Sequence, residues 1–288
     1  MQHRAPHVLI VAWDGVRDDE RAAAHTPHLD RLASRGFLTP VRVHRKNATI
    51  SGPVWTTVAT GVHSDEHGVT DNDFRRNRLD RHPDILSRVR GALPGTTTFA
   101  AGEWAPLFTA DSGGPVFPEC GYRPPLGADE SVSLEVIAAQ DEATTGRCAM
   151  ELLTRDHAVV FAYLVLPDMV GHNEGVTPRY RAAIESCDAQ LGVLLAAVEA
   201  RPSRDVEDWT VIVVTDHGHV DAGGHGGDSE AERMAWLAAA GPGIEAANGD
   251  GVDHADIAAH TIHALGLTVP EGFSGRPFGT RGTESGAS

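Results

Sequence analysis

The stretch VIVVTDHGHVDAGGHGG, residues 211–227, joins a nearly continuous apolar run to a run of polar side chains. Residues 211–215 have the composition of a strand that is covered on both faces, as in a parallel sheet between layers of helices. The polar half contains Asp216, His217, His219, Asp221 and His225. Because such side chains are costly to bury, their position directly behind a buried strand indicates a site at the edge of a sheet.

Two other apolar runs have the same character, VLIVAW at 8–13 and AVVFAYLVL at 158–166. Helix-like stretches lie between and after these runs, at 26–36, 131–156, 177–202 and 253–267. The first of them has a Thr and a Pro at its start and a Gly at its end, which are helix boundary signals. The alternation of strand and helix predicts an α/β fold with a doubly wound, mostly parallel central sheet between helical layers.

A chain of 288 residues is long enough to bury one substantial core, and we expect a single catalytic domain over residues 1–280. Residues 71–130 are rich in Gly, Pro, Asp and Arg and fit the alternation less well, so they are predicted to form a small cap or irregular insertion. Residues 281–288 are predicted to be a disordered tail.

The charge balance restricts the class of partner. Lys plus Arg number 24 against 40 Asp plus Glu, for a formal net charge of −16, and no basic block is present. Binding of a nucleic acid polymer is therefore not expected, whereas a small anionic substrate can bind where cations reverse the local field.

The three cysteines have no metal-site spacing. The N-terminal apolar run is too short for a signal peptide or a membrane span, so the sequence predicts a cytoplasmic protein. Nothing in the sequence indicates the oligomeric state.

Three carboxylates follow the three predicted strands, namely Asp14, Asp168 and Asp216. The carboxyl ends of parallel strands meet at one edge of a sheet, so these side chains are expected to lie together. His172 follows Asp168 by four residues, a spacing that places both on one helical turn. His217 is adjacent to Asp216, so joint coordination requires the strand to break there, and Gly218 is the expected break.

His225, with glycines on both sides, completes a set of three carboxylates and three imidazoles. This mixed oxygen and nitrogen set suits two divalent ions, with Zn²⁺ favoured over Mn²⁺ or Fe. Two such ions about 4 Å apart serve in-line displacement at phosphorus, so phosphoryl transfer is the predicted chemistry.

A nucleophile is predicted in NATISGPVWTTVATG, residues 47–61. Ser51 occupies an expected N-cap position, Pro53 the first turn, and Gly61 the end of a helix. A hydroxyl at a helix N-terminus lies where an alkoxide and a bound phosphate are both stabilised. Ser51 is therefore the candidate nucleophile, with Thr49 as its local competitor.

The chain resembles the alkaline phosphatase superfamily, and within it the type I phosphodiesterase/nucleotide pyrophosphatase branch. The resemblance rests on motifs that occur in the family's order: VLIVAWDG, HTPHLDRLASRG, TISGPVWTTVATGVHSDEHGVTDN, LVLPDMVGH, VVTDHGH and GGHGGDSEAERMAWLAAAGPGI. The closing stretch HADIAAHTIHALGL is also similar to the family's last helix. The resemblance thus covers nearly the whole chain.

The resemblance implies a phosphoesterase that acts on a small phosphate ester through a phospho-serine intermediate. One metal would be held by Asp168, His172 and His225. The other would be held by a second set that the resemblance places around the nucleophile: Asp14, Asp216, His217 and Ser51. Asn72 falls where the family places an Asn that contacts a phosphoryl oxygen.

Several alternatives stay open. A phosphomonoesterase or a phosphonate C–P hydrolase would use the same metals, and a non-catalytic metal- or phosphate-binding relative would keep the fold alone. Sulfate ester hydrolysis through formylglycine is disfavoured, because SGPVW lacks the Arg of the sulfatase motif.

Other polar and aromatic side chains near these motifs have weaker interpretations. Trp55, where the family's motif differs, is expected to alter the wall beside the nucleophile. Arg45 and Lys46 are candidates for a second anionic group, or a solvated pair, and Trp104 is expected to be packed rather than to stack on a leaving group. Three further histidines are expected to face solvent or to lie behind the ligands: His63, His67 and His219.

Overall fold

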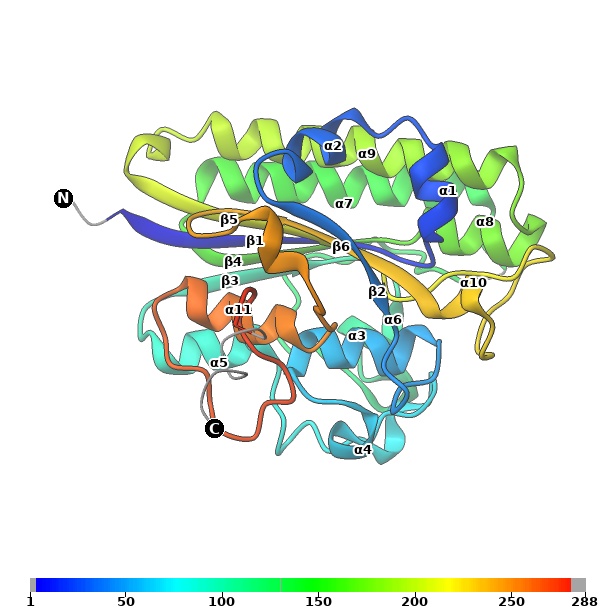
Figure 1. The fold of residues 1–288 in the computed structure, drawn as a ribbon, viewed down its shortest axis with the longest axis horizontal. Coiled ribbons are helices and arrows are strands. Elements are labelled where there is room, and N and C mark those ends of the chain that lie inside the picture. Colours follow the sequence, from blue (N-terminus) through cyan, green and yellow to red (C-terminus); the bar gives the residue numbers. More distant parts are fainter. Residues whose placement is uncertain (1–3, 130, 281–288) are drawn as a thin grey trace.

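The computed structural model describes residues 4–129 and 131–280, and its centre is a six-stranded sheet (Figure 1). The strand order is β2-β6-β5-β1-β4-β3. Strand β6 is antiparallel to both of its neighbours, and all other neighbouring pairs are parallel. The predicted mostly parallel α/β sheet is therefore confirmed. The strands are β1 Ala5–Trp13, β2 Phe37–Arg42, β3 Thr97–Ala101, β4 His157–Leu164, β5 Glu207–Val214 and β6 Met234–Ala240.

Helices cover both faces of the sheet (Figure 1). One face carries α1 Asp18–Ala23, α2 Pro27–Ala33, α7 Leu134–Thr154, α8 Leu166–Glu174 and α9 Pro178–Glu199; the other carries α3 Ser51–Thr60, α4 Ser64–His67, α5 Ile85–Ala92 and α11 Asp256–Ala264. Short helices lie in the connections: α6 Ala105–Phe108, α10 Glu230–Arg233, η1 Phe74–Arg76, η2 Asp111–Gly113, η3 Arg204–Val206 and η4 Ala246–Gly249. The two longest helices begin with side-chain caps, Ser133 on α7 and Thr177 on α9. None of the helices in the described ranges is long and apolar enough to cross a membrane.

Strand β1 is the centre of the core. All of its residues from Val8 to Trp13 are completely buried, because β4 and β5 flank it and helices cover both faces. The parallel register pairs Trp13 with Leu164 of β4, and Ala12 with Val214 of β5. The carboxyl ends of the three predicted strands are thereby aligned at one edge of the sheet.

The structure corrects two sequence-based expectations. Part of the predicted insertion 71–130 belongs to the main architecture, since β3 pairs with β4 and α5 packs against the same sheet, while residues 102–129 are mostly irregular. Strand β5 ends at Val214, so the strand breaks before Asp216 rather than at Gly218. Gly218 is instead required by packing, because a Cβ there would lie 2.1 Å from the carbonyl oxygen of Ala231. The predicted tail 281–288 lies outside the described residues.

The buried position of β1 predicts the effect of truncating it. Ile10→Ala should lower the free energy of unfolding by about 2–5 kcal/mol, because it removes buried methyl groups from a core that cannot fully close around the gap. Val193→Ala, at a side chain of α9 that is 48% exposed, is the control and should change the free energy of unfolding by less than about 0.5 kcal/mol. Urea denaturation followed by circular dichroism measures both, and equal losses would contradict the assigned core.

Candidate functional site

Three carboxylates are buried together at the carboxyl edge of the sheet. Asp14 and Asp216 are completely buried and Asp168 is 6% exposed. Among the described residues, none of the three forms an ion pair with a lysine or arginine, and the basic groups close to them are all histidines. Burial, together with Asp168, raises the pKa of Asp216 to about 8. Burial and the other two carboxylates also raise the pKa of Asp14. Without a cation, Asp14 and Asp216 therefore favour their protonated forms.

One group of potential ligands consists of Asp14, Asp216 and His217, whose donor atoms lie within 4.8 Å of one another. His217 Nε2 is 3.1 Å from Asp216 Oδ2 and 3.8 Å from Asp14 Oδ1. The Nδ1 of the same ring is 3.1 Å from the carbonyl oxygen of Gly218. A hydrogen on Nδ1 can donate to that carbonyl, which leaves the Nε2 lone pair directed at the two carboxylates.

A second group consists of Asp168, His172 and His225, also within 4.8 Å. Asp168 and His172 lie one turn apart on α8, as their spacing predicted, and Nε2 of His172 is 3.0 Å from Nε2 of His225. His225 Nδ1 is 2.8 Å from the carbonyl oxygen of Thr49, so the free nitrogen of this ring also faces its carboxylate. Because His172 is exposed, this group opens toward solvent while the first group is closed.

Of the two positions expected for His219, facing solvent or behind the ligands, the structure shows the second. Its side chain is completely buried, and its Nε2 is 2.9 Å from Asp168 Oδ1. Asp168 also lies near His172 and His225. Burial alone would raise the pKa of Asp168, but the hydrogen bond from His219 and the surrounding imidazoles outweigh it and hold this pKa below the usual value. Gly15, at φ +65°, permits this packing, because a Cβ there would lie 2.5 Å from Asp168 Oδ1.

Ser51 lies beside the closed group. Its Oγ is 3.3 Å from Asp14 Oδ1 and 3.2 Å from His217 Nε2. It is the first residue of α3 rather than the cap, since Ile50 occupies the N-cap position, and the helix ends at Gly61 as predicted. The competing hydroxyl, Thr49, donates to the carbonyl oxygen of Gly227 and accepts from the N–H of Gly226. Thr49 therefore supports the loop that carries His225 instead of facing the carboxylates.

Asn72 reaches the same helix end. Its Oδ1 accepts a hydrogen bond of 2.9 Å from the N–H of Gly52, the residue after Ser51. The side chain is exposed, and its amide nitrogen can donate to a group bound beside Ser51. An adjacent cavity of about 560 Å³ is lined by Asn72, Asp73, Arg75, Ala110, Ser112 and Gly113.

Comparison with known proteins identifies the family. Residues 8–240 match the sequence profile described as type I phosphodiesterase / nucleotide pyrophosphatase. The chain belongs to this family. Ectonucleotide pyrophosphatase/phosphodiesterase family member 7 of Rattus norvegicus is 25% identical over 231 residues, which are 75% of this chain and 50% of that protein. The chain thus spans about half the length of the curated relative it matches.

Solved structures share the fold of this phosphodiesterase-family chain. Murine ectonucleotide pyrophosphatase/phosphodiesterase 5 in complex with AMP has a TM-score of 0.64 and 19% identity, with 92% of this chain and 96% of that chain covered. The phosphonate monoester hydrolase of Agrobacterium radiobacter has a TM-score of 0.69 and 17% identity, with 94% and 76% covered. These likenesses confirm the alkaline phosphatase-like fold that the motifs predicted.

Two residues that sequence reasoning did not assign fix the position of Asp14. Trp55 Nε1 donates a hydrogen bond of 2.8 Å to Asp14 Oδ2, and the hydroxyl of Tyr163 donates to the same oxygen. The remaining oxygen, Oδ1, faces Ser51. Trp55 was expected to alter the wall beside the nucleophile, but its ring is buried and its indole N–H holds a carboxylate. The signal available in the sequence was its spacing of one helical turn from Ser51.

Helix α8, which carries two of the predicted ligands, is anchored by another buried carboxylate. Asp141 of α7 accepts hydrogen bonds of 3.0 Å from the N–H groups of Val165 and Leu166 at the start of α8. Glu103 is completely buried beside Asp141, and burial and that neighbour raise its pKa well above the usual value. A protonated Glu103 donates to Asp141, so the two carboxyl groups avoid mutual repulsion.

The remaining candidates lie outside the two groups. His67 is completely buried and 3.1 Å from Thr57 Oγ1, and His63 is nearly buried and stacks on His44, so neither faces solvent. Lys46 is paired with Asp65 at 2.7 Å, and Arg45 is exposed. Trp104 is half-buried against Phe74 and Tyr163, as expected of a packed side chain.

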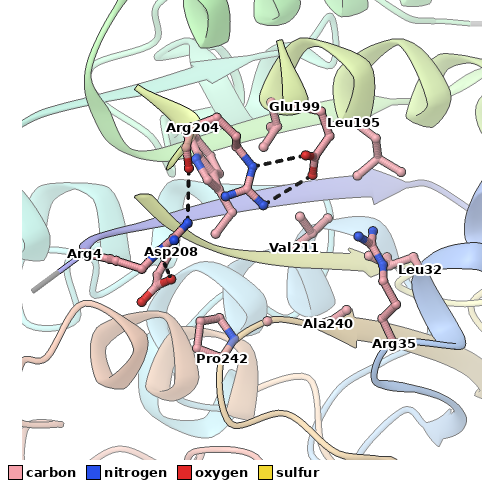
Figure 2. A pocket seen from close by; sticks show the side chains of 13 residues that line it. Arg4, Leu32, Arg35, Leu195, Glu199, Arg204, Asp208, Val211, Ala240 and Pro242 are labelled. Carbon is pink, nitrogen blue, oxygen red and sulfur yellow. Dashed lines mark hydrogen bonds and ion pairs between the residues drawn. The ribbon is translucent and has the colours of Figure 1, made fainter. Parts of the chain in front are cut away.

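Another cavity, of about 270 Å³, lies away from the carboxylate edge, where residues of α2, α9, β5 and the end of β6 line it together with Arg4, just before β1 (Figure 2). Arg4 in its wall is paired with Asp208 at 2.7 Å, and Arg204 is paired with Glu199 at 3.3 Å. None of the predicted site residues lines it. The predicted chemistry therefore belongs to the opposite edge of the sheet.

The contacts of Asp14 predict a role for Trp55 in metal binding. Trp55→Phe should weaken zinc binding about 10- to 100-fold, because it removes a hydrogen bond that orients a carboxylate ligand. Competition with a chromophoric chelator measures the affinity. Trp104→Phe is the matched control, since its ring packs near the same Tyr163 and is not bonded to Asp14. Unchanged zinc affinity in Trp55→Phe would refute the role.

Proposed function

We propose that this protein hydrolyses small phosphodiesters through a covalent phospho-serine intermediate on Ser51, with two divalent metal ions as cofactors. The observation that carries the proposal is the position of Ser51 Oγ, 3.3 Å from Asp14 Oδ1 and 3.2 Å from His217 Nε2 at the start of α3. Membership of the phosphodiesterase family supports the reaction class, and the AMP bound to the murine relative is consistent with a phosphate ester of that size.

The residues present fit the metal ions that the family implies. Asp216 Oδ2 is buried without a hydrogen-bond partner in the described part of the chain, and no lysine or arginine there neutralises the three carboxylates. Burial lowers the pKa of His217 and of His225, so both rings are neutral and able to act as ligands. Two imidazoles and a carboxylate in the open group, and two carboxylates and an imidazole in the closed group, suit Zn²⁺.

The closed group, Asp14, Asp216 and His217, would hold one ion next to Ser51. The open group, Asp168, His172 and His225, would hold the other. When bound, the ions would neutralise the carboxylates, polarise the phosphoryl oxygens and lower the pKa of the Ser51 hydroxyl.

The chain's own residues account for the rest of the proposed reaction. Asp14 Oδ1 accepts the hydrogen bond of the Ser51 hydroxyl and so orients Oγ for attack. Attack forms the Oγ–P bond and breaks the bond from phosphorus to the leaving oxygen, which takes up a proton in place of the one that the Ser51 hydroxyl loses. Water then cleaves the Oγ–P bond, which releases the phosphate monoester and regenerates the hydroxyl. The helix start and the Asn72 amide would stabilise the negative oxygens, and the cavity beside Asn72 would receive the leaving group.

Replacement of the nucleophile tests the proposal. Ser51→Ala should lower turnover of bis(4-nitrophenyl) phosphate by at least about a thousandfold, because a covalent route cannot proceed without Oγ. Ser51→Thr, which keeps a hydroxyl, is the matched control and should retain measurable turnover. Bound metal, measured by mass spectrometry, shows whether the loss arises from the nucleophile or from the ions. Turnover in Ser51→Ala equal to that of the unaltered protein would refute the nucleophile.

A further inference from the structure

Among the described residues, two groups of side chains that could hold a metal ion lie away from the carboxylate edge. One contains His7, Asp156 and Glu207. Arg201 already neutralises its carboxylates, at 2.7 Å from Glu207 and 3.4 Å from Asp156. A cation placed there would face a guanidinium, so this group is an internal ion-pair network.

The other group, His44, His63 and Asp253, has no such competitor. Its donor atoms lie within 4.8 Å of one another, the same span as in each group at the carboxylate edge. His63 Nε2 is 3.7 Å from Asp253 Oδ1, and no lysine or arginine among the described residues is paired with Asp253. The nearby Lys46 is itself paired with Asp65.

Ring nitrogens of this group are available to a ligand. His63 has a side chain only 7% exposed, and its Nδ1 is buried without a hydrogen-bond partner in the described part of the chain. His44 Nδ1 accepts from the N–H of Lys46, so binding through Nε2 requires the ring to give up this bond and to move its proton from Nε2 to Nδ1. Asp253 Oδ1 is fixed by the N–H of Ala255 at 2.8 Å. The group thus offers two imidazole nitrogens and one oriented carboxylate.

We propose that His44, His63 and Asp253 form a third cation site, specific for a first-row divalent ion such as Zn²⁺. Two imidazoles and one carboxylate are a ligand set that such ions prefer, with open positions filled by water. Burial lowers the pKa of His63, so its ring is in the neutral form that binds metal. The His44 and His63 rings are stacked, with their centroids 4.0 Å apart. On binding, the half-exposed His44 ring turns so that its Nε2 points at the ion.

The position of the group gives the third ion a structural role. His44 lies in the segment between β2 and α3 that ends at Ser51, and His63 lies between α3 and α4. Asp253 lies between η4 and α11. An ion held by all three would tie the segment before the nucleophile to the connection between α3 and α4 and to the residues before α11, independently of the metals proposed at the carboxylate edge.

Zinc stoichiometry of the full chain tests the proposal. The protein is loaded with Zn²⁺, freed of excess by gel filtration, and analysed by mass spectrometry for zinc per chain. His44→Ala and Asp253→Asn should each bind one ion fewer than the unaltered protein. His25→Ala, at an exposed histidine outside every group, is the control and should bind the same number.

The difference between variants decides the outcome, so the test holds whether or not the carboxylate edge binds two ions. The half-exposed His44 can be removed without opening the core, and equal melting temperatures of the metal-free proteins verify this. Zinc should also raise the melting temperature of His44→Ala less than that of the unaltered protein. Unchanged stoichiometry in both His44→Ala and Asp253→Asn would overturn the proposal.

Discussion

The repulsion among three buried carboxylates is the constraint on which the site depends. Asp14, Asp168 and Asp216 follow three neighbouring strands, with Asp168 in the first turn of α8, and the parallel register of β1 with β4 and β5 brings them to one edge. No lysine or arginine in the described ranges compensates them, and burial raises the pKa of Asp14 and Asp216. Asp168 is held in its ionised form by the surrounding imidazoles, whereas Asp14 and Asp216 favour ionisation only when cations replace protons, so the proposed metal binding and chemistry depend on the same burial.

Each carboxylate also has a dedicated partner that fixes its orientation. Trp55 and Tyr163 hold one oxygen of Asp14, and His219 holds one oxygen of Asp168. The N–H of Gly15 donates to Asp216 Oδ1 at 3.0 Å, which leaves Oδ2 free. These contacts come from elements distant in sequence. The ligands are therefore positioned by the whole sheet and its two helical layers rather than by a local motif.

The sequence predicts those parts of this arrangement that depend on residues close together along the chain. Continuous apolar runs identify β1, β4 and β5, and the Asp behind each run follows directly; the spacing of Asp168 and His172 predicts their shared helical turn. Strands β2 and β3 escape prediction because their runs are short or interrupted, as by Pro40 in β2, and β6 because its continuous run, MAWLAAA, is rich in alanine, which does not favour a strand. The bonds of Trp55 and Tyr163 to Asp14, and the burial of His219, depend on contacts between distant segments, which no pattern along one segment contains.

Anomalous X-ray diffraction at the zinc edge, from crystals grown with Zn²⁺, tests the central claim most directly. The account predicts two peaks roughly 4 Å apart at the carboxylate edge of the sheet. One peak should be bordered by Asp14, Asp216 and His217, and the other by Asp168, His172 and His225. A single peak at this edge, or two peaks that leave Asp216 or His225 without a metal, would contradict the account.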